Sequence, residues 1–163
     1  MKKNIQQLVL TALFAALTCV ATMLIRIPTP GTGGYIHPGD ALVILSGIFL
    51  GPTWGFLAAG LGSALADLLS GYVFYMPATF LIKGLVALLT ALVYRRLPHQ
   101  PRARTLGVIL GGLIDIVLVA GGYLIFEYTI YGPGALASVP ANIIQGTGGL
   151  IIALILSPAL RSR

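Results

Sequence analysis

The stretch PATFLIKGLVALLTALVY, residues 77–94, decides the fold class. It is apolar almost throughout, and its single charged residue is Lys83. Its length approaches the roughly 20 residues that an α-helix needs to cross a bilayer, and Pro77 suits the first turn of a helix. We therefore predict a membrane-spanning helix that carries one cation at membrane depth.

The rest of the chain has the same character. Of its 163 residues 57% are hydrophobic and 9% are charged, and the mean hydropathy is +0.96. Soluble domains are about 25% charged, so the composition excludes a water-soluble enzyme, a disordered tail and a nucleic-acid-binding domain. The length leaves room for about six spans and little else. Residues 1–163 are therefore predicted to be a single all-α integral membrane domain.

Six spans are predicted from the apolar runs and the Gly/Pro breakers between them. They cover residues 5–25, 41–50, 54–69, 77–94, 106–128 and 136–156. The second is too short to cross without loop residues, and Asp40 is expected to cap it through its carboxylate. Lys2 and Lys3 before the first run resemble a signal peptide, but no small-residue cleavage site follows, so we interpret this run as the first span.

The basic residues predict the orientation. With both termini in the cytoplasm, eight of the 10 Lys and Arg residues lie inside, as the positive-inside rule requires. These eight are Lys2, Lys3, Arg95, Arg96, Arg102, Arg104, Arg161 and Arg163. Residues 95–104 form the predicted basic cytoplasmic loop, and residues 27–39 form a long extracellular loop between the first two spans. The protein, with a net charge of +6, is expected to be a multi-pass protein of the cell membrane whose basic residues mark the cytoplasmic ends of its helices.

Ionisable residues at membrane depth are costly and commonly functional. Asp67 and Lys83 both fall in the outer half, where a structural ion pair between them is one interpretation. The other is that Lys83, with Thr79 four residues earlier on the same helix face, holds an anionic or acceptor group of a ligand. Asp115, in the middle of the fifth span, is interpreted either as a group that binds a ligand or a proton or as one that pairs with a neighbouring helix, and the sequence identifies no partner for it.

Two amides mark the last span. Asn142 and Gln145 share a helix face, and their directional donors and acceptors suit a heterocycle better than an ion. Hydrogen bonding between helices is the alternative. Glu127 lies near the outer end of the fifth span. The glycine clusters in the spans, such as residues 60–62 and 146–149, indicate either tight packing or a face kept small for a partner.

The outer loops carry the remaining candidates. Most tyrosines there are expected to form an interfacial aromatic belt, but Tyr35 and His37 lie in a loop long enough to fold over a site as a lid. His37 has no Cys or His companion, so no metal is predicted, and no cofactor is predicted. The full predicted ligand-binding set is Tyr35, His37, Tyr75, Thr79, Lys83, Tyr123, Glu127, Asn142 and Gln145.

Several functions require motifs that the sequence lacks. There is no G-x-x-x-x-G-K-[ST] phosphate loop, no H-E-x-x-H and no Ser/His/Asp set at matching depth. The chain is therefore not expected to be an enzyme or to hydrolyse ATP. A self-contained small carrier or channel stays open as an alternative, although no inverted repeat stands out.

Several stretches, taken in order, resemble the substrate-binding S components of energy-coupling-factor (ECF) vitamin transporters. They are Ala12-x-x-x-Ala16 in the first span, Gly39-Asp40-Ala-Leu-Val-Ile-Leu with Gly51-Pro52-Thr-Trp-Gly55, Gly62-Ser-Ala-Leu-Ala-Asp67-Leu-Leu-Ser-Gly71-Tyr72, and Pro77-Ala-Thr-Phe-Leu-Ile-Lys83-Gly84. The resemblance covers almost the whole chain.

The resemblance implies a binding subunit that works with partners. Such subunits hold a vitamin on the outer side, beneath the first loop, and topple in the membrane to release it inside. They associate with a membrane-embedded coupling subunit (T component) and two cytoplasmic ATPases. The contact row for the coupling subunit maps onto Ala12 and Ala16, and the third position of that row is Val20 instead of alanine.

The candidate residues suit a small polar heterocycle, such as pyridoxine or the hydroxymethylpyrimidine part of thiamine. Riboflavin is the alternative, because similar S components bind it. A folate would need more cationic groups than Lys83 and Arg26 on the outer side.

Overall fold

The computed structural model describes residues 2–28 and 35–161, with the side chains of residues 4–28 and 35–158. The centre of the predicted first loop, residues 29–34, and the side chains of Lys2, Lys3, Arg161 and Arg163 lie outside the described part. The elements are α1 (Lys2–Leu24), β1 (Ile27–Pro28), β2 (Tyr35–Ile36), α2 (Asp40–Leu50), α3 (Pro52–Leu69), α4 (Met76–Arg96), α5 (Pro101–Tyr131), the 3-10 helix η1 (Gly132–Ser138) and α6 (Val139–Arg161).

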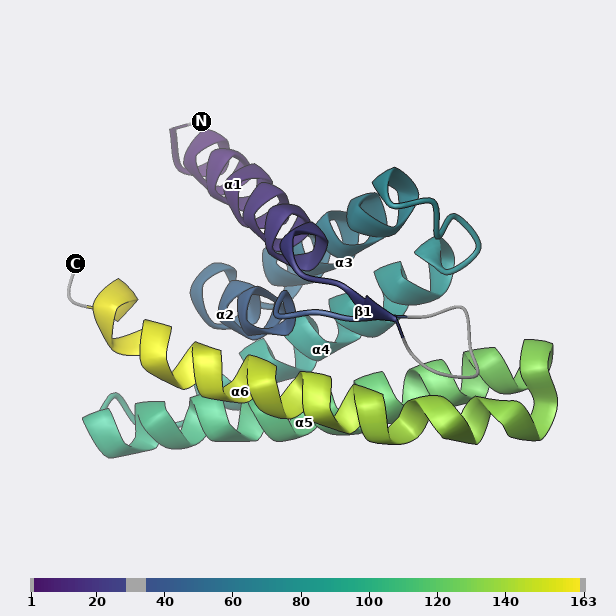
Figure 1. Cartoon of the computed structure of the whole chain (residues 1–163). Coiled ribbons are helices and arrows are strands. Elements are labelled where there is room, and N and C mark those ends of the chain that lie inside the picture. The colour runs from purple at the N-terminus through teal and green to yellow at the C-terminus, as the bar shows by residue number, and fades with distance from the viewer. Residues whose placement is uncertain (1, 29–34, 162–163) are drawn as a thin grey trace.

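The predicted all-α class is confirmed. Within the described residues, three helical stretches are long and apolar enough to cross a membrane: Asn4–Leu24, Met76–Arg96 and Pro101–Pro158, the last of which contains α5, η1 and α6. Both chain ends lie toward the left in Figure 1, whereas the strand pair and the α5–η1–α6 hairpin turn lie toward the right. Helix α1 therefore runs toward the end with the strand pair, and α5 and α6 run in opposite directions along the bundle.

The short helix α2 lies at the centre of this bundle. It contacts α1, α3, α4, α5 and α6, and eight of its 11 residues are buried. A helix surrounded in this way can be apolar on all sides. Gly47 allows α4 to approach, since a Cβ there would lie 2.2 Å from the backbone oxygen of Ala87. Gly62 does the same between α3 and α1, where a Cβ would lie 2.4 Å from the oxygen of Ala15. At these positions the glycines serve packing.

Two predicted boundaries are wrong. The basic segment 95–104 is mostly helical: α4 continues through Arg96, and α5 already begins at Pro101, because proline at the first position is compatible with a helix. The last span does not begin at residue 136, since residues 132–138 form η1 and α6 begins at Val139. Gly132, with φ of +56°, makes the reversal between the two helices.

The ends of the first loop form a small antiparallel ladder that the sequence did not predict. Ile27 pairs with Ile36, and Pro28 pairs with Tyr35. This ladder fixes the position of Tyr35 at the end of the bundle that also contains the turns after α3 and α5.

Candidate functional site

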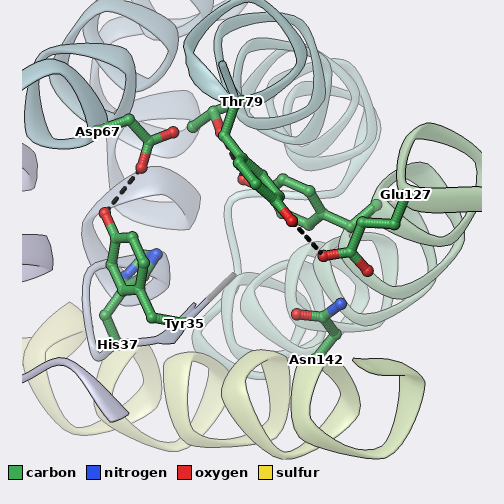
Figure 2. Close-up of a pocket in the computed structure, with 8 residues that line it drawn as sticks. Tyr35, His37, Asp67, Thr79, Glu127 and Asn142 are labelled. Atoms are coloured by element: carbon green, nitrogen blue, oxygen red, sulfur yellow. Dashed lines mark hydrogen bonds between the residues drawn. The ribbon is translucent and has the colours of Figure 1, made fainter. Parts of the chain in front are cut away.

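A pocket opens at this end of the bundle, where β2, α3, α4, α5 and α6 converge. Its empty volume, including the part open to solvent, is about 340 Å³. The residues that line it are Tyr35, His37, Asp67, Tyr75, Thr79, Tyr123, Glu127 and Asn142 (Figure 2). We call this set the pocket. It brings together seven of the nine residues of the predicted ligand-binding set, from four separate segments, and adds Asp67 from a fifth segment, α3.

Asp67 forms one wall of the pocket. Its Oδ1 accepts a hydrogen bond of 2.7 Å from the Tyr35 hydroxyl, which joins α3 to the first loop. Its Oδ2 is buried and makes no hydrogen bond within 3.5 Å to a described residue, since the neighbouring Thr79 hydroxyl shares its hydrogen bond with Tyr123. The Tyr35 ring contacts the rings of Tyr72 and His37 in tilted arrangements, with centroids 4.6 and 5.5 Å away. This wall therefore offers an aromatic face beside an unused carboxylate oxygen.

Glu127 forms the opposite wall. Its Oε1 accepts a 3.0 Å hydrogen bond from the Tyr75 hydroxyl, and its Oε2 accepts one from Ser138 of η1. The hydroxyls of Thr79 and Tyr123 share a hydrogen bond of 2.8 Å across α4 and α5. The Asn142 amide points from α6 toward Glu127 (Figure 2). The role of Ser138 could not be predicted from the sequence, because its contact with Glu127 depends on the fold of η1.

Lys83 and Gln145, the other two predicted ligand residues, are not among the lining residues. They form a buried cluster with Asp40, beneath the Tyr123 ring, whose centroid is 5.8 Å from Lys83 Nζ. Lys83 forms an ion pair with Asp40 Oδ1, and both side chains have no exposed surface. Gln145 donates a 2.7 Å hydrogen bond to Asp40 Oδ2 and accepts one of 3.0 Å from the His37 backbone N–H.

Two predictions about these carboxylates are therefore corrected. The ion pair of Lys83 forms with Asp40 and not with Asp67. Asp40 does not cap α2, because the N-cap position is Gly39 and no side chain caps it. A carboxylate beside a buried ammonium gains more from that charge than from a helix terminus. The sequence did not indicate this pairing, because Asp40 and Lys83 are 43 positions apart.

The titratable groups of the first loop are held neutral. Burial, with the nearby charge of Lys83, lowers the pKa of His37 to about 4, although Asp40 opposes the shift. The neutral imidazole accepts a hydrogen bond of 3.1 Å at Nδ1 from the Gly39 N–H. Burial and the Asp67 charge raise the pKa of the Tyr35 hydroxyl, and burial is also the main cause that raises the pKa of Tyr75. The lining residues thus contain two carboxyl groups and neither Lys nor Arg.

This arrangement suits an uncharged or cationic planar ligand with N–H or O–H donors. In the described residues, no group of three His, Cys, Asp or Glu side chains is placed to hold a metal ion.

A family model described as "ECF-type riboflavin transporter, S component" matches residues 2–162. The chain belongs to this S-component family. The family is a family of membrane transport proteins and not of enzymes, which confirms the expected class.

Individual relatives agree with this S-component assignment. The chain is 31% identical to the thiamine precursor transporter HmpT of Lactococcus lactis subsp. cremoris, over 97% of this chain and 89% of that protein. It is 37% identical to an uncharacterized protein of Pyrococcus woesei, over 82% of this chain and 86% of that protein. A solved structure of the S component of a bacterial ECF transporter matches with a TM-score of 0.68, covering 98% of this chain and 97% of that one. At 20% identity this last match shows the fold alone.

Proposed function

We propose that this S component binds a hydroxymethylpyrimidine-type thiamine precursor in the pocket and delivers it inward in an ECF importer. The observation that carries the proposal is the buried Asp67 Oδ2, which faces the pocket without a hydrogen-bond partner. An acceptor left unsatisfied in this way costs about 1–3 kcal/mol, and a ligand amino group would remove that cost. The similarity to a thiamine precursor transporter supports the same ligand class.

The other lining residues fit a small ring. Tyr35 and Tyr75 provide aromatic faces on two sides, Glu127 provides a second acceptor, and the Asn142 amide provides both a donor and an acceptor. A pyrimidine with an exocyclic amine and a hydroxymethyl group uses all of these functions. Pyridoxine belongs to the same size class, but it has no amino group to donate to Asp67.

Riboflavin is the second candidate, because the family model carries its name. Its three fused rings and ribityl chain need more space than a single ring. The pocket is enclosed by eight side chains from five segments, which favours the smaller ligand.

The membrane arrangement belongs to the same proposal. The chain crosses the cell membrane six times, and its N and C termini are cytoplasmic. Arg95, Arg96, Arg102 and Arg104 lie at the end of the bundle opposite the pocket, which the positive-inside rule places in the cytoplasm. The pocket then opens outward, beneath the first loop.

Delivery depends on partners in this proposal. A membrane-embedded T component and two cytoplasmic ATPases supply the energy, and the S component topples when docked. On α1 the predicted contact residues Ala12 and Ala16 are exposed, whereas the parallel row Thr11, Ala15 and Cys19 is buried against the bundle. The exposed row is therefore available to a partner helix.

The test is calorimetric titration of ligand-free protein in detergent with hydroxymethylpyrimidine, thiamine, pyridoxine and riboflavin. We expect the pyrimidine to bind most tightly. Asp67→Asn should weaken it about 10- to 100-fold, which corresponds to losing one hydrogen bond to a charged group. Thr129→Val, which changes an exposed residue of α5, is the matched control and should bind as the wild type does. If riboflavin binds tightly and the pyrimidine does not bind, the second candidate is the ligand. If no vitamin binds, both candidates are contradicted.

A further inference from the structure

Asp115, in the middle of α5, has no role in the pocket. Its side chain has no exposed surface. Neither of its carboxyl oxygens accepts a hydrogen bond from any described residue. Its Oδ2 faces α6, where a Cβ on Gly146 would lie 3.1 Å from it. A carboxyl group buried in a membrane helix without a donor requires an explanation, because a bare charge there is costly.

The groups around Asp115 come from each helix that packs against α5. Asp40 of α2 packs against the same turn of α6 as Asp115, since a Cβ on Gly149 would lie 2.7 Å from the Asp40 Cβ. The ammonium of Lys83, from α4, is paired with that Asp40 carboxylate. From α6 the nearest polar group of the buried cluster is the neutral Gln145 amide. The neutral His37 imidazole lies within electrostatic range of Asp40 and Lys83. No described residue of η1 is ionisable.

Asp40 already accepts hydrogen bonds from one charged and one neutral donor. Lys83 occupies Oδ1 and Gln145 occupies Oδ2. A carboxylate has about four lone-pair sites, so Asp40 can still accept one more hydrogen bond. Asp115 cannot approach it as a second anion, because two carboxylates that share a site do not both ionise.

We propose that Asp115 carries a proton, which it donates to the Asp40 carboxylate, so that the buried cluster is a proton-binding site beneath the pocket. With one anion, one cation and one neutral acid, the cluster has no net charge. This assignment does not depend on which vitamin the pocket binds.

The site has a consequence for movement. If Lys83 separates from Asp40, Asp115 is a second carboxylate within its range. Asp115 can pair with Lys83 if it passes its proton to the Asp40 carboxylate, so that the cluster again holds one anion, one cation and one neutral acid. Separation of the Asp40–Lys83 pair is then linked to transfer of one proton within the cluster, which leaves no buried charge without a partner when the helices rearrange.

Infrared difference spectroscopy of the purified full chain tests this directly. The C=O stretch of a protonated carboxyl group should be present in the wild type and lost in Asp115→Asn. Asp67→Asn is the matched control and should keep the Asp115 band. In Asp40→Asn the band should also disappear, because Asp115 then ionises to neutralise Lys83. A purely structural role for Asp115 predicts no such loss in Asp40→Asn. Vitamin binding and helical circular dichroism check that each variant is folded.

Two results would overturn the proposal. One is a wild-type spectrum that Asp115→Asn leaves unchanged, which would mean that Asp115 is ionised. The other is stabilisation by Na⁺ over choline at equal ionic strength that disappears in Asp115→Asn, which would make the site a sodium site. If Asp115→Asn does not fold, Asp40→Asn decides: a protonated-carboxyl band of unchanged intensity contradicts the proposal.

Discussion

The pocket and the buried cluster are both polar regions inside an apolar helix bundle, yet they are built in opposite ways. In the buried cluster, Asp40, Lys83 and Gln145 satisfy one another, and their neighbours enclose them. In the pocket, Asp67 keeps an oxygen free, and the walls come from five segments that leave space between them. A polar residue at membrane depth is therefore a candidate binding residue when the fold places it at an open space, and not by its burial alone.

Lys83→Ala should have the largest effect, and this effect should be a loss of stability. It leaves the Asp40 carboxylate buried without its cation, which costs about 3–5 kcal/mol. Denaturant unfolding in detergent measures the change in the free energy of unfolding. The double variant Asp40→Asn/Lys83→Met should lose less than the sum of the two single variants, because it removes both charges.

The pocket provides the matched control for that experiment. Asp67→Asn keeps an oxygen that accepts from Tyr35, so its free energy of unfolding should change by less than about 1 kcal/mol. If Lys83→Ala and Asp67→Asn destabilise the protein equally, the distinction between the two regions is wrong.

His37 lies between the two regions and should make stability depend on pH. Its pKa is about 4 in the folded protein and about 6.5 in an unfolded chain. The unfolded state therefore binds more protons, and stability should fall as the pH drops from about 6.5 to about 4, with no further His37 effect below that. Melting temperature against pH measures this. His37→Gln should flatten the dependence, whereas the exposed His99→Gln should keep it; identical profiles for all three proteins would contradict the buried neutral imidazole.

Tyr35→Phe should have the smallest effect, and this effect should be a loss of affinity for the vitamin. The ring keeps its contacts with Tyr72 and His37, but Asp67 loses a hydrogen bond worth about 1 kcal/mol. Affinity should fall several-fold in the calorimetric titration. Tyr128→Phe, at a tyrosine that is 54% exposed, should bind like the wild type. An unchanged affinity in Tyr35→Phe would show that the loop does not organise the Asp67 wall.

The S-component resemblance and the all-α fold could be predicted because they depend on local features. Apolar runs of helix length and Gly/Pro breakers are properties of neighbouring residues, and burial of apolar groups follows them wherever the helices pack. Most of the pocket could be predicted for a related reason. Polar residues near the same end of several spans, such as Tyr35, Glu127 and Asn142, must converge when the spans are bundled.

The tertiary structure alone decided which polar groups meet. Asp40, Asp67 and Asp115 are the same residue type in similar apolar surroundings, and nothing in the sequence tells their partners apart. Because α2 lies at the bundle centre, Asp40 contacts Lys83, and the strand pair brings the Tyr35 hydroxyl into contact with Asp67. The physical reason is that a buried charge pairs with the nearest group in space. The nearest group is set by helix rotation and packing over tens of residues, whereas the sequence records only which charges need a partner.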